Sequence, residues 1–292
     1  MGSLFSSSIS LRKSVRISDD EFLLLRDFIY EKSGIFVDVK RKYLFESRFS
    51  KHLGELGLSS FSDYIKYLKF DVKKAEELPR LFELVTTNET SFCRDLRQLD
   101  VFKVNVLDEI LNEQRKAGKL ELNIWSAGCS SGEEPYTLAI LLHESLKREL
   151  PLWKIKITAV DLSRTMIEQA QKGVYGEYAF KTTSDDIRKK YFTKESEGWK
   201  VKPEVQKLVH FQQMNLNDSQ SLKKVARSHI VFCRNVVIYF DEAMKKKVVG
   251  SFYDNLLPGG YLMLGHSETL HKISQAFKPL YHPGSIAYKK QG

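Results

Sequence analysis

From Lys119 onward, strand-like segments alternate with helical segments, and this alternation limits the possible folds more than any other feature of the chain. Apolar, strand-like runs occupy residues 120–127, 155–160, 229–240 and 261–265. Strands separated by helices favour parallel pairing in a doubly wound α/β sheet. Two later runs, residues 277–281 and 285–289, have no helix between them, so we expect the sheet to finish in an antiparallel hairpin.

A basic, aromatic stretch interrupts this rhythm between Gly173 and His210. Within it, residues 191–194 and 199–202 have strand-like composition and flank the short acidic segment from Glu195 to Gly198. Two such segments joined by a short turn are typical of a β-hairpin. We therefore predict a small β-subdomain inserted into the α/β domain.

The N-terminal part of the chain has helical periodicity instead. Ser18 and Glu21 have the spacing of a capping box, which predicts a helix that ends at Gly34. Apolar residues at four-residue spacing and further amphipathic runs predict three more helices, over residues 40–53, 60–68 and 74–85. The predicted organisation is an all-helical domain (1–85), a linker with a connecting helix (86–118) and the α/β domain (119–292), with the insertion at about 173–210.

Composition excludes several classes of protein. The chain has 292 residues, of which 42% are hydrophobic, and no run of eighteen apolar residues, so we expect a soluble protein without direct membrane insertion. The three cysteines lack the spacing of a zinc site or a disulfide framework, so no metal is expected, and they are typical of reduced thiols in the cytoplasm. Residues 1–6 fit the spacing of an N-myristoylation signal, although a frayed or engineered tail explains them equally well.

The formal charge of +9 raises the question of a nucleic-acid partner, so its distribution matters. Most of the excess is scattered, as on an ordinary solvated surface. Between residues 40 and 52, however, basic side chains outnumber the single acid Glu46. On the predicted second helix, one ridge carries Arg41, Arg48, Lys51 and His52.

A loop of small residues, Ser126 to Tyr136, follows the first predicted strand and leads directly into a helix. Ligands of open α/β sheets bind at the carboxyl ends of strands, and Gly128 and Gly132 would let the backbone approach a ligand closely. The loop matches neither a phosphate-binding nor a dinucleotide-binding pattern. It supplies acids instead, which suit a cationic ligand with hydroxyl groups and no phosphate, such as S-adenosylmethionine.

These acids also have a purely structural interpretation. Glu133 and Glu134 lie in the first turn of a helix, where acids stabilise the macrodipole, and Asp161 ends a strand, where Asp is an ordinary turn former. Two other segments favour the functional interpretation. Residues 86–95 are densely polar between amphipathic helices, and residues 232–241 place Arg234 and Asn235 within an apolar predicted strand, where unpaired polar groups would be costly.

Taken together, these segments make the chain resemble the CheR family of chemotaxis receptor glutamate methyltransferases. The resemblance runs from about Ser18 to Lys290. It rests on five motifs in order: Thr-Asn-x-Thr-x-Phe-x-Arg (87–94), Ser-Ala-x-Cys-Ser-x-Gly-Glu-Glu-Pro-Tyr (126–136), the strand-end Asp161, Asn215-Leu216, and Phe-Cys-Arg-Asn-Val-x-Ile-Tyr-Phe-Asp (232–241). It implies a helical domain followed by a Rossmann-like methyltransferase domain with an inserted β-subdomain.

The resemblance also implies roles for individual residues. Arg94 and Tyr239 would be catalytic, nearest the methyl group and the incoming glutamate, and Asp161 would hold the ribose hydroxyls of S-adenosylmethionine. One departure is Cys93, where the family usually has a Phe, so we expect a looser pocket wall there. The cofactor pocket would be lined by Asn88, Thr90, Arg94, Glu134, Asp161, Asn215, Leu216, Arg234 and Asn235.

The implied partners are the glutamate-rich cytoplasmic methylation helices of chemoreceptors, and Arg41, Arg48 and Lys51 would dock their acidic surface. In some relatives the β-subdomain also binds a receptor C-terminal peptide; the short hairpin loop here leaves that open. We expect a monomer that binds no nucleic acid. Two rivals stand beside this prediction: an adaptor that binds the cofactor without catalysis, and a nucleic-acid methyltransferase, whose Asp/Asn-Pro-Pro-aromatic motif residues 234–237 do not match.

Overall fold

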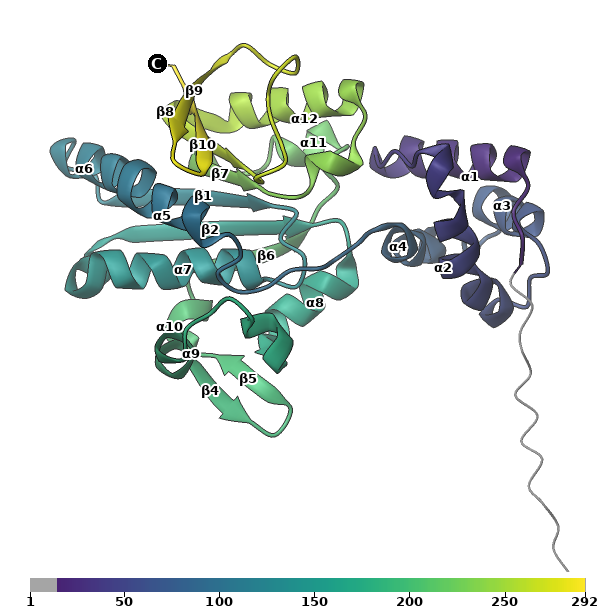
Figure 1. The fold of residues 1–292 in the computed structure, drawn as a ribbon, viewed down its shortest axis with the longest axis horizontal. Helices are drawn as coiled ribbons and strands as arrows, with labels where there is room; N and C mark the ends of the chain where they lie inside the picture. Colours follow the sequence, from purple (N-terminus) through teal and green to yellow (C-terminus); the bar gives the residue numbers. More distant parts are fainter. Residues whose placement is uncertain (1–14, 292) are drawn as a thin grey trace, which may run out of the picture. The chain divides into compact units, whose positions relative to one another are not determined.

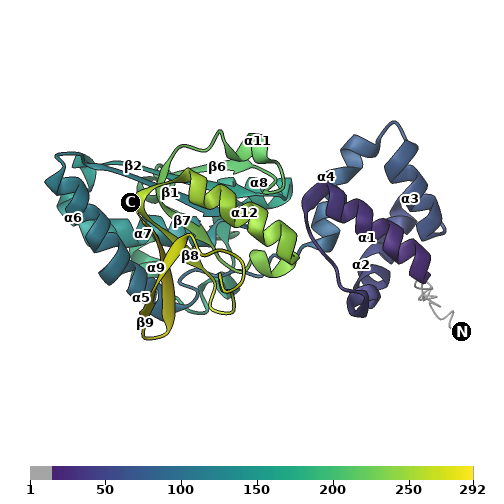
Figure 2. The same ribbon diagram turned by 90° about the horizontal axis from the view of Figure 1, so that it is seen from above.

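The computed structural model describes residues 15–291, and the proposed myristoylation signal therefore lies outside the described residues. The chain forms two compact units (Figures 1 and 2). Residues 37–85, with the chain up to Ile29, form the first unit. Residues 30–36 and 86–292 form the second.

The first unit is all-helical. Its first helix starts as predicted, because Ser18 N donates to Glu21 Oε2 at 2.9 Å and Glu21 N donates to Ser18 Oγ at 3.2 Å, which completes the capping box. Ser60 caps another helix by accepting from Asp63 N at 3.1 Å. The helical elements are α1 (Asp19–Ser33), whose last residues belong to the second unit, η1 (Val39–Arg41), α2 (Lys42–Glu55), α3 (Phe61–Phe70) and α4 (Lys74–Val85).

Aromatic side chains fill the core of this unit. Phe45 and Phe49 of α2 are buried, and Phe49 packs edge-on against Tyr64 with ring centroids 5.7 Å apart. His52 differs from the prediction, since it is buried and does not share the exposed basic ridge. Its Nε2 lies 2.6 Å from Glu77 Oε1, and the Tyr64 hydroxyl donates to the same oxygen at 2.6 Å. Burial of the Glu77 carboxylate requires these partners.

The second unit is built around a seven-stranded sheet of order β6-β2-β1-β7-β8-β10-β9. The first five strands in this order pair in parallel, and the last two pair antiparallel as a hairpin. This confirms the predicted Rossmann-like fold with a terminal hairpin. The strands are β1 (Glu121–Ala127), β2 (Lys154–Asp161), β6 (Val209–Gln213), β7 (Ser228–Cys233), β8 (Leu256–Leu264), β9 (Phe277–His282) and β10 (Ser285–Lys290).

Helices cover both faces of this sheet (Figure 1). Along β1, Trp125 packs against Phe252 of α12, with ring centroids 5.1 Å apart, while its neighbour Ser126 donates to Glu134 of α7 at 2.7 Å. Successive side chains of a strand point to opposite faces, so α12 and α7 lie on opposite sides. The helical elements are α5 (Leu96–Val101), the π-helical η2 (Phe102–Leu107), α6 (Asp108–Lys116), α7 (Glu133–Leu146), η3 (Lys147–Leu152), α8 (Arg164–Lys172), α11 (Ser219–Leu222), η5 (Val237–Tyr239) and α12 (Glu242–Asn255).

The strand predicted over residues 229–240 is wrong in its second half. β7 ends at Cys233, Asn235 adopts a left-handed conformation with φ of 60°, and a 3-10 turn follows. Arg234 and Asn235 therefore lie after the strand, at its carboxyl end, and not within it. Every helix among residues 15–291 is too short or too polar to cross a lipid bilayer.

A second, three-stranded sheet of order β3-β5-β4 lies within the chain between α8 and β6. β4 and β5 form the predicted hairpin, and β3, which the sequence did not predict, pairs with β5. Phe92 packs between Tyr175, Phe180 and Phe192, with ring centroids 4.8 to 5.1 Å away. The elements are β3 (Val174–Tyr175), η4 (Glu177–Phe180), α9 (Asp185–Tyr191), β4 (Phe192–Glu195), β5 (Gly198–Val201) and α10 (Pro203–Gln206).

Candidate functional site

A cavity of about 1040 Å³, counted with the open space at its mouth, lies within the second unit. Its lining comes from the segments that follow the parallel strands β1, β2, β6 and β7, together with residues 86–91 and the chain around Ile35 and Tyr239. This is the edge of an open α/β sheet at which ligands bind. The nine predicted lining residues and the predicted catalytic residue Tyr239 all line this one cavity: Asn88, Thr90, Arg94, Glu134, Asp161, Asn215, Leu216, Arg234, Asn235 and Tyr239.

Asp161 ends β2 and supplies one acid to the cavity. Its two oxygens accept from Ser130 N at 2.7 Å and from Ser163 N at 2.9 Å, so the carboxylate fixes both the loop after β1 and the start of α8. Burial raises the pKa of Asp161, and the backbone N–H groups oppose this. Carboxylate lone pairs beyond these two bonds remain for a ligand hydroxyl.

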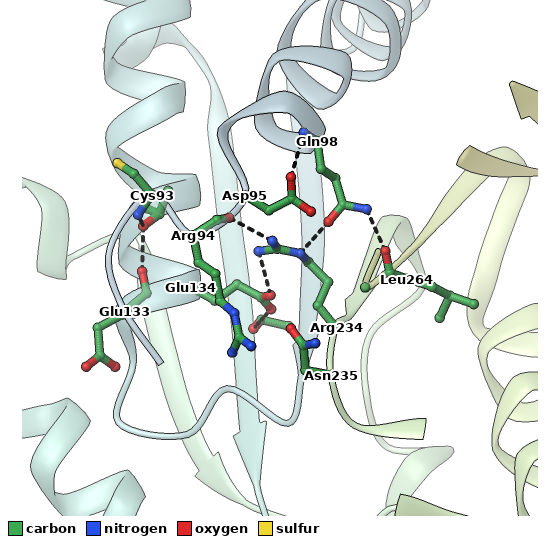
Figure 3. A network of polar contacts seen from close by, with 12 residues as sticks. Cys93, Arg94, Asp95, Gln98, Glu133, Glu134, Arg234, Asn235 and Leu264 are labelled. Carbon is green, nitrogen blue, oxygen red and sulfur yellow. Dashed lines mark hydrogen bonds and ion pairs between the residues drawn. The ribbon is translucent and has the colours of Figure 1, made fainter. Parts of the chain in front are cut away.

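Arg234 is the centre of a buried polar network (Figure 3). Its guanidinium donates through Nε to the side-chain oxygen of Gln98, through Nη1 to Glu134 Oε2 at 3.4 Å, and through Nη2 to the carbonyl oxygen of Arg94 at 2.7 Å. Gln98 in turn donates to the carbonyl oxygen of Leu264. These contacts join α5, α7, the chain after β7 and the end of β8, so Arg234 shapes the cavity wall chiefly through protein contacts.

Glu134 lies at the start of α7 and accepts from Ser126 Oγ at 2.7 Å as well as from Arg234. Burial raises the pKa of Glu134, and the neighbouring Arg234 guanidinium opposes this. The carboxylate is thus held within the cavity wall by one neutral and one charged donor. It faces the same cavity as Asp161.

Arg94 and Tyr239 line the cavity from different segments. Arg94 Nη1 donates to the carbonyl oxygen of Glu89 at 2.9 Å, and the Tyr239 hydroxyl lies 3.4 Å from the carbonyl oxygen of Thr87. The second contact is long for a hydroxyl donor. Cys93 and Asp95 on either side of Arg94 both have positive φ, at 55° and 63°, so the backbone here is held in a conformation that only a firmly fixed segment adopts.

The remaining predicted lining residues also hold the chain around the cavity. Asn215 Nδ2 donates to the carbonyl oxygen of Lys32 at 2.6 Å and its Oδ1 accepts from Asn217 N at 2.9 Å. The carbonyl oxygen of Asn88 accepts from Ser130 Oγ at 3.3 Å. Leu216 is buried and supplies an apolar wall.

Comparison with known protein families identifies the family to which this fold and cavity belong. Residues 88–284 match the family model described as CheR methyltransferase, SAM binding domain, and residues 20–86 match CheR methyltransferase, all-alpha domain. The chain belongs to the CheR methyltransferase family. This confirms the resemblance that the five motifs indicated.

Curated relatives of this CheR chain match along almost its whole length. Chemotaxis protein methyltransferase 2 of Vibrio cholerae serotype O1 is 34% identical over 275 residues, which cover 94% of each chain. The chemotaxis protein methyltransferase of Borreliella burgdorferi is 33% identical over 258 residues, which cover 88% of this chain and 90% of that one. A third, from Vibrio parahaemolyticus, is 35% identical over 279 residues, covering 94% and 98%.

The donors and acceptors of the CheR cavity fit S-adenosylmethionine. The cavity contains two carboxylates, Glu134 and Asp161, for a ligand with cationic groups and hydroxyls. Its two arginines, Arg94 and Arg234, donate hydrogen bonds to protein oxygens and do not form a phosphate cradle. No cluster of three or more His, Cys, Asp and Glu within residues 15–291 is arranged to hold a metal ion.

The structure places three further residues of the predicted site outside the cavity lining. Gly132 faces Ala170, the Tyr175 hydroxyl and Phe211, outside the residues that line the cavity. Glu133 is buried away from the cavity and accepts from Ser131 Oγ at 2.8 Å. Cys93 is also outside the lining, so its smaller side chain does not loosen the pocket wall.

Gly128 does line the cavity, but its reason for being glycine is different from the one expected. Its φ is +83°, and an added Cβ would lie 2.3 Å from Val236 Cγ2. The glycine therefore makes room for the segment after β7, in addition to lining the cavity.

Two buried residues of the site were missed by sequence reasoning. Thr137 of α7 accepts from Cys93 N at 3.1 Å and thereby fixes the backbone beside Arg94. Glu268 accepts from backbone N–H groups of the segment after β7. Thr137 carries no sequence signal, because it lies in an ordinary apolar helix, whereas Glu268 between apolar strands is an isolated acid that needs partners.

The three predicted docking residues belong to the first unit, and each is described there by itself. Arg41 and Lys51 are exposed, and Lys51 Nζ lies 3.6 Å from Glu55 Oε1 in a surface pair. Arg48 is half-buried and donates to the carbonyl oxygen of Leu84 at 3.2 Å. The Arg48 side chain thus has a structural role in joining α2 to α4.

Proposed function

We propose that this CheR methyltransferase transfers a methyl group from S-adenosylmethionine to glutamate side chains of chemoreceptors, giving glutamate methyl esters and S-adenosylhomocysteine. The observation that carries this proposal is the gathering of Glu134, Asp161, Arg94 and Tyr239 around one cavity at the carboxyl edge of the sheet. The curated relatives are named chemotaxis protein methyltransferases, which supports a receptor as the substrate. The protein would act in the cytoplasm as a monomer.

In this proposal the cofactor is held by the residues that line the cavity. Asp161 accepts from the ribose hydroxyls, and Glu134 faces the cationic groups. When bound, S-adenosylmethionine supplies a sulfonium methyl group that is open to attack by an anionic oxygen. Asn88, Thr90, Asn215, Leu216, Arg234 and Asn235 complete the pocket.

The proposed reaction needs an aligned substrate carboxylate and does not need a general base. A glutamate with a pKa of about 4.3 is ionised at neutral pH, so its oxygen attacks the methyl carbon while the carbon–sulfur bond breaks and its electron pair stays on sulfur. We assign the orientation of that carboxylate to the Arg94 guanidinium and the Tyr239 hydroxyl. Alignment at a near-attack distance of about 3 to 3.5 Å can supply much of the acceleration.

The basic side chains of η1 and α2 would recruit the substrate. Receptor methylation helices are rich in glutamate, and Arg41 at the end of η1 adds positive charge next to Arg48 and Lys51 of α2. Such charge raises the encounter rate of oppositely charged partners and loses its effect in high salt. This part of the proposal concerns encounter and affinity, not the chemical step.

One assay separates this proposal from its rivals. The protein is incubated with methyl-labelled S-adenosylmethionine and a receptor cytoplasmic fragment, and the product is treated with alkali. Methyl esters hydrolyse to volatile labelled methanol, whereas methyl groups on nitrogen remain attached. Label that stays on the product would overturn the ester assignment, and cofactor binding without any transfer would leave an adaptor that is catalytically idle.

A further inference from the structure

We infer that Glu268 is a positioning residue for methyl transfer, which fixes the turn that presents Asn235 and Tyr239 to the cavity. The inference rests on the proposed roles of these residues and extends them to a side chain outside the cavity lining. Glu268 is 7% exposed and lies after β8, far beyond Tyr239 along the sequence.

The contacts of Glu268 form a clamp on the backbone. Its Oε2 accepts from Asn235 N at 2.8 Å and from Gly265 N at 2.7 Å, and its Oε1 accepts from Val236 N at 3.0 Å and Ile238 N at 3.2 Å. Four N–H donors thus share one carboxylate. Hydrogen bonds to a charged acceptor are stronger than neutral ones, and without Glu268 these donors would lose the partner that satisfies them.

The clamped segment has no regular strand or helix to hold it. Asn235 has φ of 60°, which an asparagine adopts more readily than most residues but still at a cost, and η5 (Val237–Tyr239) is a single 3-10 turn. Tyr239 N donates to the carbonyl oxygen of Val236 at 3.0 Å, so the position of Tyr239 follows directly from a residue that Glu268 holds.

Two glycines show how closely the clamp fits. A Cβ on Gly265 would lie 2.7 Å from Glu268 Oε2 and 2.9 Å from Asn235 N, so glycine is required for the carboxylate to reach the turn. On the other side, Val236 occupies the space beside Gly128. The turn after β7 is therefore held between the loop after β1 and the segment after β8, and small displacements of it would move Tyr239.

The chemistry of the clamp requires a carboxylate. In Glu268→Gln one oxygen becomes an amide NH₂ group, which would face two N–H donors and accept from neither. In Glu268→Asp the charge remains but the side chain is one methylene shorter. We expect the Gln variant to lower kcat by about tenfold to a hundredfold, the larger loss being what a misplacement of about 1 Å costs, and the Asp variant to recover part of that loss.

The test compares kcat, KM and amide hydrogen exchange in Glu268→Gln, Glu268→Asp and a control, Asn255→Ala. Asn255 Nδ2 donates to the carbonyl oxygens of Val225 and Ala226, outside the cavity lining, so its removal reduces stability without a reason to alter kcat. We expect faster exchange of the amides of residues 235, 236 and 238 in the two Glu268 variants only. In the double variant that combines Glu268→Gln with Tyr239→Phe, kcat should fall by less than the product of the two single losses, because both substitutions act through Tyr239.

A folded Glu268→Gln variant with wild-type kcat, or losses that multiply in the double variant, would overturn the inference. If Glu268→Gln does not fold, Glu268→Asp carries the same comparison. If the wild-type protein forms no methyl ester, the proposed function fails, whereas unchanged exchange of residues 235–238 in the variants would refute the clamp itself. The two failures are therefore distinguishable.

Discussion

The guanidinium of Arg234 donates to the carbonyl oxygen of Arg94 at 2.7 Å, across a sequence separation of 140 residues. One buried arginine thereby fixes the backbone of the other, whose own side chain lines the cavity. The same guanidinium contacts Gln98 and Glu134 (Figure 3). The wall of the cavity and the placement of Arg94 therefore depend on one network.

Arg234→Lys tests this network while it keeps the charge. A lysine ammonium cannot reproduce the planar fork that reaches three acceptors in three directions. Loss of a partner from a buried ion pair typically costs about 3–5 kcal/mol, and retention of the charge should reduce that. We expect a lower free energy of unfolding in urea and weaker binding of S-adenosylhomocysteine by calorimetry. Unchanged values for both would show that the network does not support the site.

Tyr239→Phe tests the proposed orientation of the substrate carboxylate. The hydroxyl has only a 3.4 Å contact with the carbonyl oxygen of Thr87, so its removal should cost the fold little. We expect kcat to fall by roughly tenfold to a hundredfold, because alignment is lost, while the affinity for the cofactor stays near that of the wild type. A variant that turns over at the wild-type rate would remove Tyr239 from the mechanism.

Replacement of Glu133 by Gln should change how the free energy of unfolding depends on pH. Burial raises the pKa of Glu133 above its usual 4.5, so the folded state binds the proton more tightly than the unfolded state. The stability from this group is therefore fully present below pH 4.5 and is lost as the pH rises through the folded pKa. Gln is neutral throughout, and we expect Glu133→Gln to be more stable than the wild type at pH 7 in urea unfolding.

That advantage should disappear as the pH falls below about 4.5, where the wild-type carboxyl becomes protonated in both states. The comparison between the two proteins isolates Glu133, because Glu134 and Asp161 titrate in both. A constant difference across the whole pH range, or a less stable variant at pH 7, would contradict the assignment.

Charge reversal on η1 and α2 tests receptor docking. Lys51→Glu and Arg41→Glu are better probes than Arg48→Glu, because Arg48 also donates to the carbonyl oxygen of Leu84 and its loss would disturb the fold. We expect a higher KM for a receptor fragment at low salt, an unchanged kcat, and convergence with the wild type at 1 M salt, where the screening length is about 3 Å. Lys69→Glu on α3 is the control, because it changes the net charge by the same amount at another helix. An equal rise of KM in this control would show that the effect comes from net charge and not from the position of the basic residues.

Much of the fold could be predicted because local patterns determine it. The capping box at Ser18, the spacing of Phe45 and Phe49 and the strand–helix alternation each depend on neighbouring residues, and the structure shows them. Motifs likewise located the lining of the cavity, since a residue that follows a parallel strand must lie at the same edge as the others.

The predictions are wrong where a residue that is distant in the sequence determines the local structure. Residues 236–240 are apolar enough to continue β7, but Asn235 turns the chain and Glu268 accepts the N–H groups that a strand would have paired. His52 shares the periodicity of the basic ridge, yet it is buried because its ring pairs with Glu77 on another helix. Periodicity describes one element at a time and contains no information about such acceptors.

Titration of S-adenosylhomocysteine into the purified protein by calorimetry shows whether the cavity containing Asp161 and Glu134 binds the cofactor. We predict a saturable heat for one site in the wild type, and binding weakened by at least tenfold in Asp161→Asn, which keeps the shape of the side chain and loses its charge. No heat with the wild type, or an unchanged affinity in a folded Asp161→Asn variant, would show that this cavity is not the cofactor site.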